Sequence, residues 1–371
     1  MNEVDPATLV PYVQWGGFLL AFVFGFVANK THFCTMGAVS DIINMGSWAR
    51  MRMWLLAIAV AILGTCALQV SGLIDTRNSI YTSSNFLWLS HVVGGLLFGV
   101  GMTLGSGCGS KTLIRVGTGN LKSLIVVVFM AIAAYMTLRG LFGAFRVEYL
   151  DAIAVQLPTN QDLPSLLAQF TGAARDRVAL LSALIAAALL LVFVFAHPDG
   201  RDKDVLLGGI VTGLVVVGGW YVSGTLGYVP EDPESLQEAW VATNTGRMES
   251  LSFVAPQAYF LEWLMLWTDA SLLLSFGILL ALGVVAGSMA YALLSRTFRL
   301  ESFRDPGDML NHMLGGILMG FGGITALGCT IGQGISGFST LALGSILSFA
   351  AIVTGSALTM KYQYWRLMRE A

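Results

Sequence analysis

Long runs of apolar residues alternate along the chain with short polar connections. Runs bounded by charged or turn-forming residues lie near positions 12–29, 53–74, 86–105, 120–144, 179–196, 205–222, 268–294, 311–327 and 340–360. Their lengths are close to the about 20 residues that an α-helix needs to cross about 30 Å of hydrocarbon. Strands of a membrane barrel would instead show alternating apolar and polar residues. We therefore predict an all-α integral membrane protein with about nine transmembrane helices.

Two kinds of segment do not fit this pattern of simple spans. Residues 31–47 are too polar and too broken, and short pieces rich in small residues follow Cys108 and Cys329. Irregular backbone at membrane depth is tolerated only where it is buried in protein or lines a water-filled cavity. We expect short re-entrant helices at these places.

The distribution of basic residues indicates an orientation. The first residues, Met1 to Pro6, lack the basic region of a signal peptide, so the first apolar run is expected to remain as a span. Nine crossings place the two ends on opposite sides, and cytoplasmic loops carry an excess of Lys and Arg. With the amino terminus outside, the basic residues left outside are Arg77, Arg139, Arg146, Arg175, Arg177 and Arg247. We expect a multi-pass protein of the inner membrane with a cytoplasmic carboxyl terminus, and with the other basic residues, including Arg304, on the cytoplasmic side.

One segment of the chain is repeated. HVVGGLLFGVGMTLGSGC, from His91 to Cys108, aligns without gaps with HMLGGILMGFGGITALGC, from His312 to Cys329. The predicted topology sends the two copies through the membrane in opposite directions. Inverted repeats are typical of transporters that hold their substrate near the midplane. We expect a single transmembrane transporter domain over 1–371, with half-repeats at 12–144 and 205–360 and a connector helix at 179–196.

Composition agrees with a location in lipid and excludes one class of partner. Hydrophobic residues make up 56% of the chain and charged residues 11%, far more apolar side chain than one water-soluble core requires. The net charge is −2, and Lys and Arg are scattered through the loops, so no nucleic-acid partner is expected. The sequence contains no nucleotide-binding motif.

Three of the four cysteines share a setting. They occur in THFCTMGAVSD (Cys34), GSGCGSKT (Cys108) and LGCTIGQGISG (Cys329), each at the start of a short segment rich in Gly, Ser and Thr. Unpaired N–H groups and a partial positive charge at a helix start attract anions. A thiol is a weak donor and a soft acceptor, which suits an anion with both sulfur and oxygen atoms. Cys66, within the smooth run ILGTCALQV, is expected to be a small packing residue.

The candidate substrate-binding residues follow from these three motifs. Lys111 either supplies positive potential to the path or is an ordinary cytoplasmic-side lysine, and Gln333 and Thr330 either bind oxyanion oxygens or satisfy re-entrant backbone. Without a Cys-x-x-Cys or a histidine pair, neither a metal site nor a cofactor is expected, nor any catalytic residue. The candidates are Cys34, Thr35, Gly107, Cys108, Gly109, Ser110, Lys111, Gly328, Cys329, Thr330 and Gln333.

Over most of its length the chain resembles the YeeE/YedE family of sulfur-compound transporters, most specifically at LGCTIGQGISG, GSGCGS and HFCTMGAVSD. The resemblance implies nine crossing helices, short helices that point into an hourglass-shaped, positively charged pathway, and an inverted repeat. It also implies that Cys34, Cys108 and Cys329 pass thiosulfate along by weak thiol hydrogen bonds. Some members act with a TusA-like cytoplasmic sulfurtransferase, and others are linked to selenium metabolism.

The function expected from residues and resemblance together is uptake of thiosulfate or a related small sulfur-containing anion. Two alternatives stay open: a membrane sulfurtransferase that forms a cysteine persulfide, and a transporter of a selenium compound. One departure from symmetry is expected, because the span from Leu206 leads into GGWYVSGTLG and no cysteine stands there opposite Cys34.

Overall fold

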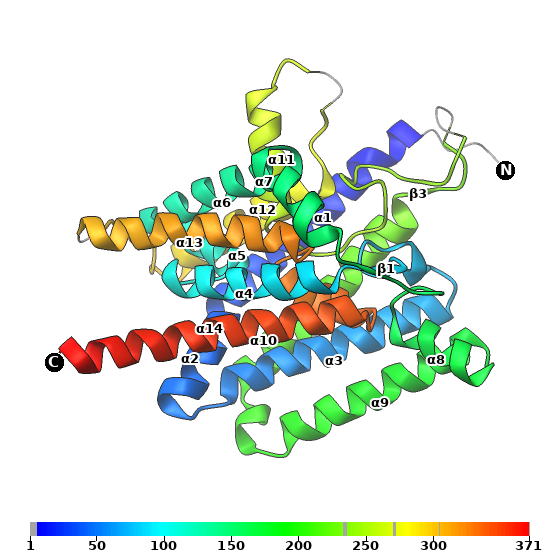
Figure 1. The fold of residues 1–371 in the computed structure, drawn as a ribbon, viewed down its shortest axis with the longest axis horizontal. Helices are drawn as coiled ribbons and strands as arrows, with labels where there is room; N and C mark the ends of the chain where they lie inside the picture. Colours follow the sequence, from blue (N-terminus) through cyan, green and yellow to red (C-terminus); the bar gives the residue numbers. More distant parts are fainter. Residues whose placement is uncertain (1–5, 233–235, 270–271, 304, 371) are drawn as a thin grey trace.

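The computed structural model describes residues 6–232, 236–269, 272–303 and 305–370, so Arg304 lies outside the described residues. The structure is mostly helical, and its long helices run side by side, with the start of the first helix at one end and the end of the last helix at the other (Figure 1). They are α1 (Pro6–Lys30), α3 (Ala49–Val70), α4 (Trp88–Leu104), α6 (Leu121–Arg139), α9 (Arg175–Phe195), α10 (Lys203–Tyr221), α12 (Phe276–Leu294), α13 (Pro306–Thr325) and α14 (Leu343–Glu370). The all-α membrane class is confirmed.

A long helix covers each of the predicted spans. Within the described residues, eight helical stretches are long and apolar enough to cross a membrane. Helix α13 is not one of these eight, because Asp308, Asn311 and His312 lower the hydropathy of its first half, although its 20 residues suffice in length. It nevertheless packs closely against both α4 and α6.

Several of the predicted spans begin or end at other residues in the structure, and the last of them runs on to Glu370. The span expected at 120–144 stops at Arg139, because Gly140 takes an extended conformation that breaks the helix before α7 (Leu141–Phe145) begins. The span expected at 268–294 starts only at Phe276, where the Ser275 hydroxyl accepts a hydrogen bond from the Ile278 N–H at 3.3 Å and caps the helix. Residues 270–271 lie outside the described residues.

Short elements connect the long helices. Three of them lie where re-entrant pieces were expected: α2 (Thr35–Met45), α5 (Gly109–Gly117) and the π-helix η5 (Gly332–Gly337). The others are η1 (Thr76–Asn78), η2 (Arg146–Asp151), α8 (Leu163–Thr171), η3 (Pro198–Arg201), η4 (Val222–Leu226) and α11 (Ala255–Met265). Two small antiparallel sheets pair β1 (Asn85–Phe86) with β2 (Val155–Gln156), and β3 (Tyr228–Val229) with β4 (Ala239–Trp240).

The contacts between helices follow one exchange of partners between the two halves of the chain. Helix α1 packs on α12 as α10 packs on α3, and α6 packs on α13 as α14 packs on α4. The short helices follow the same exchange, since α2 contacts α3 and α14 while α11 contacts α12 and α6. Helix α9 packs on α3, where the Arg52 guanidinium donates a hydrogen bond to the Phe193 carbonyl oxygen at 2.6 Å. We propose that two half-repeats are joined by α9 in one transmembrane domain.

Glycines bring the helix backbones into direct contact. A Cβ atom on Gly99 of α4 would lie 2.2 Å from the Ile352 carbonyl oxygen of α14, and one on Gly320 of α13 would lie 2.4 Å from the Met130 carbonyl oxygen of α6. Such distances leave no space for a side chain. Gly99 and Gly320 each lie four residues after another glycine on their helix, a spacing that lets helices approach closely.

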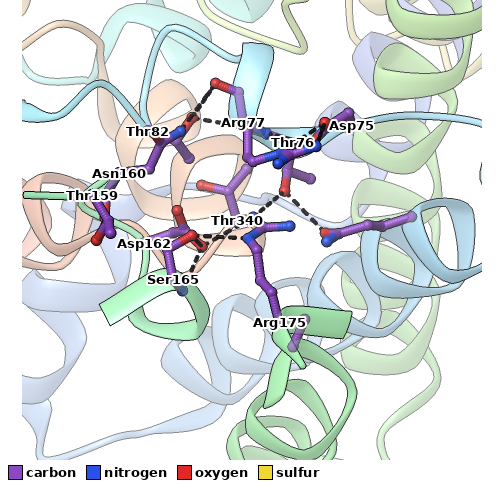
Figure 2. Close-up of polar contacts among 12 residues, drawn as sticks. Asp75, Thr76, Arg77, Thr82, Thr159, Asn160, Asp162, Ser165, Arg175 and Thr340 are labelled. Carbon is purple, nitrogen blue, oxygen red and sulfur yellow. Dashed lines mark hydrogen bonds and ion pairs between the residues drawn. The ribbon is translucent and has the colours of Figure 1, made fainter. Parts of the chain in front are cut away.

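A buried ion pair between Asp162 and Arg175 lies at the connection between α8 and α9 (Figure 2). The fully buried Asp162 caps α8 by accepting a hydrogen bond from the Ser165 N–H at 3.1 Å. Its carboxylate also lies 3.1 Å from the Arg175 guanidinium at the start of α9, and the Arg175 Nε donates to the Ser165 hydroxyl at 2.8 Å. Arg175 thus joins the starts of two consecutive helices.

Replacing Arg175 with alanine is expected to lower the stability of the protein by about 1–3 kcal/mol, because a buried carboxylate loses its charged partner. Thermal unfolding of the purified protein in detergent measures the effect. Arg177→Ala is the matched control, since Arg177 lies on the same turn of α9 and is exposed. Equal unfolding temperatures for the two variants would contradict the expectation.

Candidate functional site

The three cysteines of the sequence motifs share one backbone geometry. Each lies two residues after a non-glycine residue whose positive φ ends the preceding helix, and each stands where a new short helix begins. The Cys34 Sγ accepts a hydrogen bond from the Gly37 N–H at 3.3 Å, and the Cys329 Sγ accepts one from the Gly332 N–H at 3.4 Å. The residues with positive φ are His32 (52°), Ser106 (55°) and Leu327 (59°).

The three cysteines lie near one another inside the bundle. Cys108 is fully buried, and its thiol lies close enough to the Cys34 thiol for the two groups to interact. It also lies near Thr330, the residue that follows the equally buried Cys329. The Ser110 hydroxyl lies 3.4 Å from the Cys108 Sγ. The fold therefore brings together three motifs that are far apart in the sequence.

Cys66 lies apart from this group. Its Sγ is 3.9 Å from the Ala179 carbonyl oxygen, in the contact between α3 and α9. It is buried among apolar side chains of the core. The expected packing role of Cys66 is confirmed.

Positively charged side chains lie on one side of the thiols. The half-buried Lys111 of α5 is close enough to interact electrostatically with both Cys34 and Cys108, and with the guanidinium groups of Arg50 and Arg115. Of the two interpretations of Lys111, this position favours positive potential in the path. Its role in binding stays a prediction.

Arg50 is a site residue that the sequence did not single out. Its guanidinium crosses the first turn of α2 so closely that a Cβ on Gly37 would lie 2.3 Å from the Arg50 Nη1. The Arg50 Nε pairs with Asp41 at 3.0 Å, which fixes the side chain against the turn that begins at Cys34. From the sequence, Arg50 is only one of the basic residues on the predicted cytoplasmic side. The signal for its position was the glycine three residues after Cys34, which leaves room for a side chain against this turn.

The remaining candidates flank the cysteines. Gly107 and Gly109 adjoin Cys108, and the buried Thr35 hydroxyl has no hydrogen-bond partner among the described residues. The Gln333 side-chain amide donates to the Ala326 carbonyl oxygen and so closes the turn that contains Gly328. This bond supports a role of Gln333 in satisfying re-entrant backbone, and its role in binding stays a prediction.

A cavity of about 170 Å³ lies beside the turn that leads into Cys329. Leu327 and Gly328 line it, together with residues of α11 and α12. Loop residues complete the wall, among them Tyr81, Glu249 and Ser252. The cavity is thus in contact with Gly328, the residue directly before Cys329.

The structure corrects the expected counterpart of Cys34 in the second half. Because α11 occupies the place of α2 in the symmetric packing, its N-cap residue Val254 corresponds to Cys34, and GGWYVSGTLG does not. Val254 and its neighbour Phe253 lie beside Gly109 and Gly323. The absence of a fourth cysteine at the site is as expected, but an apolar residue stands in its place.

The chain is similar to known proteins over most of its length. Residues 30–358 match the model of a family described as sulphur transport. The chain is 29% identical over 325 residues to the thiosulfate transporter TsuA of Escherichia coli, and the alignment covers 86% of each protein. It is 24% identical over 348 residues to the thiosulfate transporter TsuA of Spirochaeta thermophila, covering 92% of this chain and 96% of that protein.

Proposed function

The chain belongs to the sulphur transport family, as its resemblance to the YeeE/YedE proteins implied, and on that premise we propose that it takes up thiosulfate. The two similar proteins are both named as transporters of this anion, which supports transport over an enzymatic sulfur transfer. The multi-pass helical bundle fits the same conclusion.

The observation that carries the proposal is that residues of three separate cysteine motifs lie close together inside the bundle. Cys34, Cys108 and the Cys329–Thr330 pair lie one after another in the interior of the bundle. Each thiol offers a weak donor and a polarizable acceptor to a ligand with a soft sulfur atom. Conduction needs several modest sites rather than one tight site, because the ion must leave each site again.

The proposed path runs from the cavity to Cys329, then to Cys108 and Cys34. Helix starts and loop N–H groups at each cysteine balance the charge of the anion. Lys111 and Arg50 add positive potential beside Cys34, the last thiol on the path. The groups proposed to touch the anion are Cys34, Thr35, Gly107, Cys108, Gly109, Ser110, Lys111, Gly328, Cys329 and Thr330.

The proposal includes an orientation in the inner membrane. An outside amino terminus and a cytoplasmic carboxyl terminus are supported by the excess of Lys and Arg on the side of α14's end. Thiosulfate then leaves past Arg50 and Lys111 into the cytoplasm, where a TusA-like sulfurtransferase receives it.

Uptake of labelled thiosulfate into proteoliposomes tests the proposal. Accumulation should be competed by unlabelled thiosulfate and much less by sulfate, which has no soft sulfur atom to present to a thiol. Stronger competition by a selenium analogue than by thiosulfate would instead indicate a selenium transporter. Mass spectrometry after turnover should find Cys34, Cys108 and Cys329 unmodified, and covalently added sulfur on any of them would contradict a simple carrier.

A further inference from the structure

The cavity beside Cys329 has the size and the polar groups of an anion-binding site. Its volume of about 170 Å³ compares with the about 30 Å³ that one water occupies in the liquid, so a small oxyanion fits with space left. Its polar lining comes from two connections between long helices, around Tyr81 and around Glu249, Ser250 and Ser252, and from Arg146. None of these residues belongs to the cysteine motifs.

Tyr81 lines this cavity and carries a buried donor at its edge. Its side chain is 2% exposed, and its hydroxyl has no hydrogen-bond partner among the described residues. A Cβ on Gly332 would lie 3.2 Å from the Tyr81 Oη and 2.9 Å from the Ser252 Oγ, and the Gly332 N–H is the donor to the Cys329 Sγ. The hydroxyl therefore lies against the same turn that holds the first thiol of the path.

The Tyr81 ring is fixed in place by its neighbours. It meets the Trp220 ring edge to face, with ring centroids 6.2 Å apart and an angle of 86° between the planes. Trp220 is itself held by a hydrogen bond from its Nε1 to the Ser339 hydroxyl at 3.0 Å. A buried donor that is held rigidly and left unpaired is costly, and a ligand acceptor satisfies it.

Glu249 brings a carboxylate into the same cavity. The Thr245 N–H and hydroxyl donate to its Oε1 at 3.1 and 2.5 Å. Burial raises the pKa of Glu249 above its ordinary value, although the two hydrogen bonds from Thr245 lower it in part. Tyr81 and Tyr259 both lie near enough to Glu249 to interact with its charge.

The other charged groups around Glu249 are already paired. Arg146, from η2, lies 3.1 Å from Asp151, and Arg139, at the end of α6, lies 3.1 Å from the buried Glu262 of α11. Within the described residues Glu249 itself forms no ion pair, and Arg247, two residues before it, is exposed. An anion that enters the cavity thus meets an uncompensated carboxylate.

We propose that this cavity is an outer binding site for the oxygen atoms of the transported oxyanion, where Tyr81 donates a hydrogen bond and Glu249 takes up a proton. The proposal rests on the proposed transport of thiosulfate, and it adds a binding site that the anion occupies before it reaches Cys329. Two negative charges in one small cavity oppose each other, so the anion favours the neutral carboxylic acid. The proton comes from the outside solution. It also reduces the net negative charge that must move toward a negative cell interior.

Replacing Tyr81 with phenylalanine tests the hydrogen bond. The KM for thiosulfate uptake into proteoliposomes should rise roughly tenfold or more, because a hydrogen bond to a charged ligand is lost from a buried site. The maximal rate should change by less than about twofold, since the thiols are unchanged. Tyr228→Phe, at a half-buried tyrosine outside this cavity, is the control and should leave the KM unchanged. An unchanged KM in Tyr81→Phe overturns the proposal.

Replacing Glu249 with glutamine tests the proton. In the wild-type protein the KM should rise about tenfold per unit of outside pH once the pH exceeds the pKa of Glu249, because only the protonated acid admits the anion. In Glu249→Gln the KM should stay low and independent of pH. Glu238→Gln, at an exposed glutamate, should keep the wild-type slope.

A pH slope retained in Glu249→Gln, or absent from the wild type, overturns the role of Glu249. Size-exclusion chromatography in detergent checks that each variant is folded. A wild-type protein that takes up no thiosulfate at all contradicts the proposed function instead, so the two failures are distinguishable.

Discussion

Replacing Cys108 with alanine is expected to abolish thiosulfate uptake while the helix bundle stays folded. Cys108 lies between Cys34 and Thr330, so its thiol is the link between the two ends of the proposed path. Loss of a hydrogen bond to a charged group costs about 1.5–3 kcal/mol, and each 1.4 kcal/mol is a factor of about ten. Uptake should therefore fall about a hundredfold. Labelled uptake into proteoliposomes measures it.

Three further variants make this result interpretable. Cys329→Ala should lose uptake in the same way, because Cys329 adjoins the cavity at the start of the path. Cys66→Ala is the matched control, since Cys66 is a buried cysteine in the contact between α3 and α9 and should retain full uptake. Cys108→Ser keeps a donor but not a polarizable sulfur, so partial uptake is expected. Wild-type rates in both Cys108→Ala and Cys329→Ala would refute the path through the thiols.

Replacing Gly99 with alanine is expected to destabilise the bundle strongly. A Cβ there would lie 2.2 Å from the Ile352 carbonyl oxygen and 2.7 Å from the Ser356 nitrogen, both of them backbone atoms of α14. Neither atom can rotate away, so α4 and α14 must move apart. Overpacking of this kind costs about 1–3 kcal/mol and occasionally more. A lower unfolding temperature in detergent and a smaller yield of folded protein measure the effect.

Gly105→Ala is the control for this variant. Gly105 ends the same helix, but its Cβ would meet the Met319 Cε at 3.1 Å, the end of a flexible side chain that can move. The unfolding temperature of Gly105→Ala should remain near that of the wild type. If Gly99→Ala unfolds at the same temperature as Gly105→Ala, the close approach of α4 and α14 does not determine stability.

The long helices were predictable because each one is a continuous apolar run. The ends of the helices were less predictable, since the polarity of a run does not reveal a local cap such as Ser275 or a backbone break such as Gly140. The first half of α13 shows the opposite case, in which a polar and largely exposed segment remains helical because the Asp305 side chain caps its first turn and Asp308 pairs with Lys122 of α6. Local contacts decided what hydropathy left ambiguous.

The candidate site was predictable where the sequence repeats a motif, and not elsewhere. Cys108 and Cys329 follow from one gapless repeat, and Cys34 from its similar glycine-rich setting. Tyr81 and Glu249 come from connecting segments without any periodicity, so only the fold reveals that they line one cavity with Cys329's turn. Val254 could not be matched to Cys34, because α2 and α11 share their packing but not their residues.

The exchange of partners between the two halves has a consequence for biogenesis. Helix α1 packs on α12 and α3 on α10, so the long helices of the first half find their most extensive contacts in the later half of the chain. A nascent chain that has inserted only its first half therefore holds its glycine-lined contact faces against lipid until translation delivers the rest. Contacts between such distant segments form slowly. The half-inserted intermediate is consequently the stage at which a membrane chaperone or a quality-control protease has the longest access to this protein.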